Sequence, residues 1–402
     1  MATIKIGLIG CGGRGRGAVV NALKNTSTSD VKVVAIADAF PDRVASTAEL
    51  LAKQFADKTD IPPERQFSGL DCHEKLLKTD ADVVLLCEPP GFRPSHFAAA
   101  VESGKHIFAE KPVAVDSPGV RKFIEANEKA KKNKQIVLVG HHLRFEKKHT
   151  IPIEMVHNGA IGDITYVRIF FDTGYLWTRP RKDGQTEMEH QVNNWYYFNW
   201  LSGDHIVEQH VHDIDVMNWF LGDRHPVEAN GMGGRCVRIG KDFGEIFDHH
   251  SVEYVFEERG IRGYSDCRQI NNCWNSFSEH VYGTKGELHI EGHGTSVLQI
   301  KGKEPQSWKR DYDGHQAEMD FLFGAITKGE EFNNGGIGAT ATLTAILGRM
   351  ATYSGNVVKW DDALNSTLDT FPKSLAWDAD PGPKPDELGI YPCAQPGKTK
   401  AW

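Results

Sequence analysis

Short apolar segments alternate with amphipathic segments along the first third of the chain. Five of the apolar segments predict buried strands: residues 4–9, 31–37, 82–87, 106–109 and 136–139. The amphipathic stretches between them predict helices over residues 17–24, 41–56, 95–103 and 116–131. Non-alternating strands separated by helices are typical of a parallel sheet covered on both faces. This part of the chain therefore predicts an α/β domain.

The pattern changes near residue 150, where strand-like segments follow one another with few helices between them. These segments are residues 164–171, 228–237, 251–256, 261–266, 280–282, 287–291 and 296–300. They predict a large, mostly antiparallel open sheet, followed by a helix over 338–354 and a proline-containing tail that forms an extended arm. The division predicts two domains, 1–147 and 148–402. The open sheet face suits a homodimer or homotetramer interface, although a solvated face fits the same pattern.

Composition narrows the class of protein. The 402 residues are 40% hydrophobic and 25% charged, which is typical of a globular chain. A net charge of −8 argues against a nucleic-acid partner, and no apolar run is long enough to span a membrane. The seven cysteines are odd in number and form no CxxC, and the N-terminus does not resemble a signal peptide. We expect a cytoplasmic protein with no membrane partner.

A glycine-rich loop follows the first predicted strand. Residues 10–15 read GCGGRG, which matches G-x-G-x-x-G, and a helix is expected to follow directly. Gly10 permits the tight turn, Gly12 lets the backbone approach a diphosphate, and Gly15 allows close helix packing. The helix N-terminus then offers unpaired N–H groups to the phosphates, with Gly13 in the same loop. The loop predicts a dinucleotide site; a glycine turn in a nucleotide-free domain is the alternative.

Acidic and basic residues near this loop bear on the choice of cofactor. Asp38 ends the second predicted strand, 23 residues beyond Gly15, and suits hydrogen bonds to the adenosine ribose. Its charge would repel a 2′-phosphate, so we expect NAD rather than NADP. Arg43 weakens that preference if it turns toward the ribose. Arg14 is a candidate for phosphate contact, and a solvated side chain is the alternative.

Five stretches together resemble the Gfo/Idh/MocA oxidoreductases, the family of glucose–fructose oxidoreductase and inositol dehydrogenase. They are the glycine loop, Glu88-Pro89-Pro90 with His96, the run from Gly104 to Pro112 that contains Glu110-Lys111-Pro112, the pair Arg144-Phe145, and residues 203–215. The resemblance implies a Rossmann domain, a C-terminal α/β domain and a site between them. It implies that Lys111 has a catalytic role, and that Pro89, His96, Glu110 and Lys111 contact the cofactor.

Residues 203–215 read GDHIVEQHVHDID and hold the second group of candidate catalytic residues. If this segment is helical, His205, Glu208, His212 and Asp215 fall within an arc of about 80°. A carboxylate one turn before a histidine suits general base chemistry, so His212 is the expected base and Glu208 its partner. The family places aspartate where this chain has Glu208, which is one methylene longer.

The same segment raises the question of a metal site. The order H-x-x-E-Q-H matches neither H-E-x-x-H nor H-x-x-E-H, so we expect no metal here. A polar helix end at a domain interface is the plainest alternative to a catalytic segment.

Several residues are candidates for substrate contact. Trp195 and Tyr197 lie in a stretch of aromatic and asparagine residues, which suits the apolar faces and hydroxyls of a sugar; core packing is the alternative. His141 and Arg144 follow the last predicted strand of the first domain, and His141 is a second candidate acid or base. His205 is the remaining candidate.

These features predict an NAD-dependent oxidoreductase that acts on a secondary hydroxyl of a sugar, polyol or glycoside. The alternative is an NAD-dependent glycosidase or epimerase that oxidises its substrate transiently and recycles a tightly bound NAD. A non-catalytic sugar sensor that retains the nucleotide fold is a third reading, against which Lys111 and His212 argue.

Overall fold

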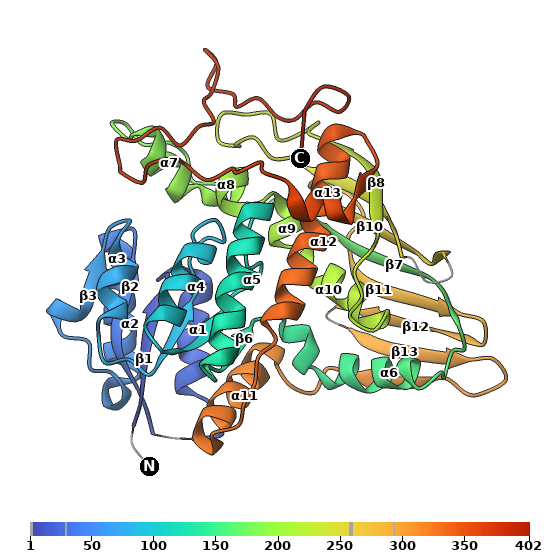
Figure 1. The fold of residues 1–402 in the computed structure, drawn as a ribbon, viewed down its shortest axis with the longest axis horizontal. Helices are drawn as coiled ribbons and strands as arrows, with labels where there is room; N and C mark the ends of the chain where they lie inside the picture. Colours follow the sequence, from blue (N-terminus) through green and yellow to red (C-terminus); the bar gives the residue numbers. More distant parts are fainter. Residues whose placement is uncertain (1–2, 29, 257–259, 293) are drawn as a thin grey trace. The chain divides into compact units, whose positions relative to one another are not determined.

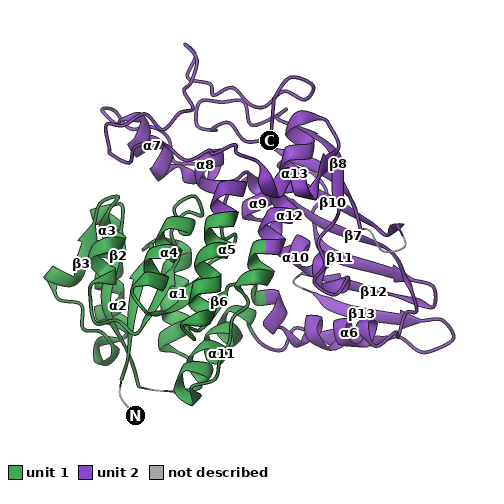
Figure 2. Ribbon diagram, in the orientation of Figure 1, with its two compact units in different colours: residues 1–114, 121–142, 313–339 green, residues 115–120, 143–312, 340–402 purple. Residues whose placement is uncertain are grey.

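The computed structural model describes residues 3–28, 30–256, 260–292 and 294–402. The chain forms two compact units (Figure 2). Unit 1 comprises residues 1–114, 121–142 and 313–339, and unit 2 comprises residues 115–120, 143–312 and 340–402. Residues 313–339 therefore belong to unit 1, whereas the predicted boundary at residue 147 places them in the second domain.

Unit 1 contains a six-stranded parallel sheet. Its strand order is β3 (Gln66–Ser68), β2 (Val31–Asp38), β1 (Ile4–Ile9), β4 (Val83–Leu86), β5 (His106–Ala109) and β6 (Val137–Val139). This order, 3-2-1-4-5-6, is that of the Rossmann fold. All four residues of β4 and all three of β6 are buried, as expected for a sheet covered on both faces. The predicted parallel α/β domain is confirmed.

Helices connect these strands. They are α1 (Gly13–Leu23), α2 (Pro41–Gln54), η1 (Ala56–Lys58), η2 (Pro63–Arg65), α3 (Cys72–Leu77), α4 (Arg93–Glu102) and α5 (Ser117–Lys132), with η3 (His142–Phe145) after β6. Helix α1 begins at Gly13, four residues before the predicted start, because Gly13 and Gly15 of the loop already belong to the helix. Helix α11 (Gly314–Lys328) packs against α1. The sequence pattern predicted neither α11 nor α3 with its neighbour β3.

Unit 2 contains a nine-stranded, mostly antiparallel sheet (Figure 1). Among the described strands of this sheet, β7 and β10 are the one parallel pair. The strand order is β14 (Gln306–Lys309), β13 (Thr295–Ile300), β12 (Gly286–Glu291), β11 (Ser276–Gly283), β7 (Ile164–Thr173), β10 (Arg262–Gln269), β9 (His249–Val255), β8 (Glu228–Gly234) and β15 (Val358–Lys359). Every second residue of β10 is buried, so the sheet has one covered face. The expected sheet is confirmed.

The helices described next lie after residue 146, and most of them are short. They are α6 (Lys147–His157), α7 (Glu187–Asn193), η4 (Trp195–Tyr197), α8 (Asn199–Ser202), α9 (His205–Glu208), α10 (Val211–Phe220), α12 (Gly335–Ser354) and α13 (Trp360–Asn365). The single helix considered for residues 203–215 is wrong. The N–H of His210 bonds to the carbonyl of His205, five residues back, so α9 ends in a wide turn and α10 begins after it.

The C-terminal tail is an extended arm. Residues 366–402 contain no helix or strand, and all of them lie in the described part of the chain. The arm is held against unit 2 by hydrogen bonds: Gln191 Nε2 donates to the carbonyl of Pro383 at 2.7 Å, and Arg235 Nη2 donates to that of Tyr391 at 2.6 Å. The expected surface-wrapping arm is confirmed. No helix among the described residues has the length and apolar character needed to cross a membrane.

Candidate functional site

The glycine loop between β1 and α1 has the packing that a dinucleotide site needs. Gly10 has φ +95°, and a Cβ there would lie 2.5 Å from the backbone of Cys87. A Cβ on Gly15 would lie 1.8 Å from the carbonyl oxygen of Gly10. By contrast, no atom lies within 4 Å of a Cβ on Gly12 or Gly13. The loop is therefore closed toward the protein and open at the N-terminus of α1, which fits a bound diphosphate.

Asp38 stands at the carboxyl end of β2, as the fingerprint requires. Its Oδ2 accepts the N–H of Cys11 at 2.8 Å, and its Oδ1 accepts that of Phe40 at 3.0 Å. Arg43 Nη1 lies 3.9 Å from Oδ1. Burial raises the pKa of Asp38, while Arg43 and the two N–H groups oppose that effect. The carboxylate is thus fixed beside the glycine loop, with one cation within reach.

Arg14 has carboxylate partners that the sequence did not indicate. Its guanidinium is paired with Glu110, and its Nη2 lies 3.1 Å from Oε1 of Glu318 on α11. Both carboxylates are buried. Burial works against the charged form of Glu110, but Arg14, followed by Lys111, holds its pKa below the usual range. In this structure Arg14 ties the loop to the end of β5, and its contact with a phosphate stays a prediction.

The ends of β4 and β5 carry the other residues expected near the cofactor. Lys111 follows β5 and is half-buried, in the cis peptide Lys111–Pro112. Arg93 is buried and donates to the carbonyls of Glu88 and Pro112, which joins the two strand ends. His96 is buried, with Nδ1 3.5 Å from Oε1 of Glu88. Two further expected residues differ in exposure: Pro89 is half-buried, and His141, which follows β6, is 1% exposed.

In unit 2, Glu208 and His212 are the ionisable residues of segment 203–215 that reach the surface. Glu208 ends α9 and His212 lies in the first turn of α10, and both are half-buried. The three aspartates of the segment, Asp204, Asp213 and Asp215, are by contrast at most 1% exposed. The interrupted helix thus leaves the expected base and its expected partner accessible.

The buried histidines of this segment have other partners. His210 lies between Asp213, whose Oδ2 is 3.2 Å from Nδ1, and Ser265 on β10, whose Oγ is 2.7 Å from Nε2. Burial lowers the pKa of His210 to about 3, so the ring is neutral. His205 is 1% exposed, and burial lowers its pKa as well. Its buried position gives a substrate no surface to contact in this structure.

Arg144 and Asp215 form a two-point ion pair within unit 2. Arg144 Nε and Nη2 donate to the two oxygens of Asp215 at 2.7 and 2.9 Å, and Nη2 also donates to Asp223 at 2.6 Å. The guanidinium lies over the ring of Trp219, 4.8 Å from its centroid. These contacts make Arg144 an anchor for α10, and its role in substrate binding stays a prediction.

The aromatic stretch before α8 is partly core. Tyr197 has no exposed surface, and its hydroxyl donates to the carbonyl of Leu176 at 3.2 Å, so it packs the interior where substrate contact was expected. Trp195 is half-buried and lies 5.9 Å from Trp177, which is 40% exposed. Arg179 stacks on Trp177 at 4.5 Å. Trp177 and Trp195 therefore keep exposed ring surface in this region.

The sequence pattern did not indicate two buried residues, one beside Arg14 and one beside Asp204. Glu318 belongs to α11, a helix whose pattern was not recognised. His250 belongs to β9 and lies next to Asp204, 3.3 Å away. No local spacing could have revealed either contact, because each joins segments far apart in the sequence.

Two family models match the chain. Residues 4–141 match the model described as "Oxidoreductase family, NAD-binding Rossmann fold". Residues 153–289 match the "GFO/IDH/MocA C-terminal domain". Together they span most of the sheet residues of both units.

Similar proteins carry related names. Inositol 2-dehydrogenase of Rhizobium meliloti (strain 1021) is 24% identical over 364 residues, which are 87% of this chain and 97% of that protein. A glycosyl hydrolase family 109 protein of Porphyromonas gingivalis is 29% identical over 191 residues, 46% of this chain and 38% of that protein. A solved structure of levoglucosan dehydrogenase, in complex with NADH and levoglucosan, has a TM-score of 0.71 at 15% identity and covers 89% of this chain and 99% of its own. This last likeness concerns the fold.

Proposed function

The chain belongs to the Gfo/Idh/MocA family of NAD-binding oxidoreductases, and from this premise we propose that it moves a hydride from a secondary hydroxyl of a sugar, polyol or glycoside to NAD. The observation that supports this proposal most is the division within segment 203–215. Glu208 and His212 stay accessible, while Asp204, Asp213 and Asp215 are buried. An accessible carboxylate four residues before an accessible histidine is suited to proton abstraction.

The cofactor is held by residues of unit 1. The open N-terminus of α1, with Gly12 and Gly13, receives the diphosphate, and Asp38 accepts hydrogen bonds from the adenosine ribose. Arg43 beside Asp38 moderates the preference for NAD over NADP. When bound, NAD supplies the acceptor for the hydride.

The side chains of this protein handle the proton. His212 takes the proton of the substrate hydroxyl, and Glu208 orients the imidazole and stabilises its charged form. The ammonium of Lys111 donates a hydrogen bond to the same oxygen, which favours the alkoxide. Proton transfer of this kind contributes about 10² to 10⁴-fold to the rate. His141 stays a second candidate acid or base.

The substrate class follows from the relatives and from the exposed aromatic surface. A relative over most of the chain is named inositol 2-dehydrogenase, a protein whose name indicates a polyol substrate. Trp177 and Trp195 offer ring faces on which the C–H groups of such a ring can stack. Substrate contact at these two residues is part of the proposal.

We also propose that the open face of the nine-stranded sheet forms a homodimer or homotetramer interface. Tyr166 and Tyr264 are exposed on neighbouring strands of this face, and Tyr166 stacks on Tyr282 at 4.4 Å. Trp274 is 65% exposed. Exposed aromatic residues of this kind are enriched at interfaces. Light scattering of wild type and Tyr264→Glu checks this: a loss of mass on substitution supports the interface, and a monomeric wild type contradicts it.

Quantification of NAD(H) released by denaturing freshly purified protein tests the reaction type. A chain that releases little cofactor, yet forms NADH when NAD and a polyol such as myo-inositol or an aldose are added, supports the dehydrogenase. Near-stoichiometric NAD that survives dialysis, with cleavage of an aryl glycoside and no net NADH, supports the alternative glycosidase. The glycosyl hydrolase relative, which matches less than half of this chain, is the reason to include the glycoside.

A further inference from the structure

Two histidines and an aspartate from separate elements form a buried cluster in unit 2. Asp204 caps the N-terminus of α9, His205 is the first residue of that helix, and His250 lies on β9. All three side chains are at most 2% exposed. The cluster is distinct from Glu208 and His212, which reach the surface.

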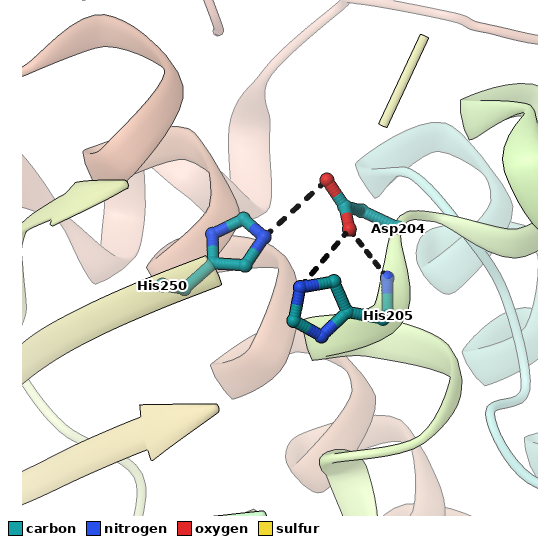
Figure 3. A group of neighbouring side chains, drawn as sticks. All are labelled: Asp204, His205 and His250. Carbon is teal, nitrogen blue, oxygen red and sulfur yellow. Dashed lines mark hydrogen bonds and ion pairs between the residues drawn. The ribbon is translucent and has the colours of Figure 1, made fainter. Parts of the chain in front are cut away.

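The donor atoms of the cluster converge on one point. His250 Nε2 lies 3.3 Å from Asp204 Oδ2, and His205 Nε2 lies 3.9 Å from Asp204 Oδ1. All three donor atoms lie within 4.8 Å of one another, and Figure 3 shows both rings and the carboxylate turned toward the same space. Neither Nε2 has a hydrogen-bond partner, although both are buried. The 3.3 Å contact is short enough for a hydrogen bond but does not have the direction of one.

Two of the three side chains, those of Asp204 and His250, are held in place by other groups. Asp204 Oδ2 accepts the hydroxyl of Tyr353 at 2.6 Å and the N–H of Phe247 at 2.9 Å. His250 Nδ1 lies 2.9 Å from Oγ1 of Thr352. Such contacts orient the side chains of metal ligands, and Asp204 Oδ1, which accepts the N–H of His205 at 2.5 Å, keeps a second lone pair for an ion.

Charge gives the cluster a reason to bind a cation. A buried carboxylate is costly unless a positive charge compensates it. Burial also favours the neutral imidazole, which is the form that binds metals. The guanidinium of Arg349 is engaged elsewhere, since its Nη1 donates to the carbonyl of Gly203 at 2.9 Å.

We propose that Asp204, His205 and His250 bind one divalent transition-metal ion, of which Zn²⁺ suits the donor set best. Two imidazole nitrogens and a carboxylate oxygen are ordinary zinc ligands, and tetrahedral coordination places such atoms about 3.4 Å apart. One ligand atom from each of the three residues lies within 4.8 Å of the other two, so side-chain shifts of up to roughly 1.4 Å would bring them to that separation. This proposal revises the expectation of no metal, which tested only spacings inside segment 203–215.

The ion is structural, because no substrate can reach a cluster that is buried on all sides. It joins the start of α9 to β9, and α9 ends at Glu208. The ion therefore fixes the helix that presents Glu208; only this consequence rests on the proposed function, and metal binding does not.

The test is the metal content of the full chain, purified without a histidine tag or chelator and measured by mass spectrometry before and after dialysis against Zn²⁺. We expect about one equivalent per chain in the wild type. Replacement by Co²⁺ should give the visible absorption of a tetrahedral ion, and a chelator should lower the thermal midpoint. These wild-type readouts do not depend on the folding of any variant, and none of them measures turnover.

Variants then assign the ion to its ligands. His205→Ala and His250→Ala should each lower the zinc content at least about tenfold. Two matched controls should keep it: His289→Ala on β12, and His249→Ala, which neighbours His250 but belongs to the separate group Cys236, Asp248 and His249. A wild type that takes up no zinc after dialysis would overturn the proposal. So would zinc that is lost only in His249→Ala, or retained in both His205→Ala and His250→Ala.

Discussion

Arg14 of the glycine loop is ion-paired with Glu110, the residue that directly precedes Lys111. A second carboxylate, Glu318 of α11, lies 3.1 Å from the same guanidinium. One cation therefore joins two parts of the expected cofactor site, the glycine loop and the end of β5. Helix α11 also contacts this cation, although it lies about two hundred residues further along the chain than β5.

Removing this cation should destabilise unit 1. Arg14→Met removes the guanidinium that both buried carboxylates share, and we expect a loss of about 3 kcal/mol in the free energy of unfolding. Arg16→Met is the matched control, because the Arg16 guanidinium donates to the neutral hydroxyls of Ser46 and Thr47; its loss should stay below about 1 kcal/mol. Denaturant unfolding of the three proteins measures the difference. Equal losses of unfolding free energy in both variants would show that the ion pairs of Arg14 with Glu110 and Glu318 contribute no more to stability than the hydrogen bonds of Arg16.

The charge of Asp38 should set the choice of cofactor. Asp38→Asn keeps an oxygen acceptor but loses the charge, so NAD should bind about tenfold more weakly and its advantage over NADP should narrow. Arg43, 3.9 Å from Asp38, then has no carboxylate partner at that position and can meet a 2′-phosphate. Calorimetric titration with both cofactors checks this, with Asp42→Asn in the first turn of α2 as control. An unchanged NAD to NADP ratio in Asp38→Asn would remove Asp38 from the ribose site.

Glu208 should act through its charge and not its length. Glu208→Gln keeps the shape but loses the carboxylate, and we expect kcat to fall about 10²-fold with little change in KM. Glu208→Asp restores the residue that the family places here and should retain activity within about tenfold. Steady-state kinetics at several pH values separates the two variants. If Glu208→Gln were as active as wild type, Glu208 would have no part in the proton transfer.

The contact of the arm with α7 should make stability depend on pH. His190 of α7 is buried, stacks with Tyr391 at 6.4 Å, and burial lowers its pKa from 6.5 to about 4. Below pH 6.5 the unfolded chain therefore binds more protons than the folded chain. Stability should fall as the pH drops from about 6.5 to about 4, by at most roughly 3 kcal/mol from this group.

His190→Phe supplies the comparison, since a phenyl ring keeps the stacking and cannot titrate. Thermal midpoints at pH 7 and pH 4.5 should differ less for this variant than for the wild type. If both proteins lost the same stability over this range, His190 would not be a source of the acid sensitivity.

Most of the fold could be predicted from the local pattern of hydrophobic and polar residues. Buried parallel strands are hydrophobic throughout, whereas strands with one covered face alternate. The failures have physical causes. α11 packs on α1 across most of the chain length, a contact that no local pattern encodes. The break between Glu208 and Val211 comes from the wide turn at His210, whose ring is held by Ser265 of a distant strand. Residue types made Glu208 and His212 candidates for the site, whereas only tertiary structure could show that Arg144 binds Asp215 and that Tyr197 is core.

The most direct test of the proposed reaction is NADH formation by wild type, Lys111→Met and His212→Ala on a panel of myo-inositol, aldoses and methyl glycosides. We expect the wild type to form NADH from at least one of these compounds. In both variants the rate of NADH formation should fall at least about 10²-fold, while the affinity for NAD stays within a few-fold of wild type. Lys122→Met, an exposed lysine that bonds Ser95, should retain full activity. Turnover that persists in Lys111→Met or His212→Ala at near-normal rates would contradict the account.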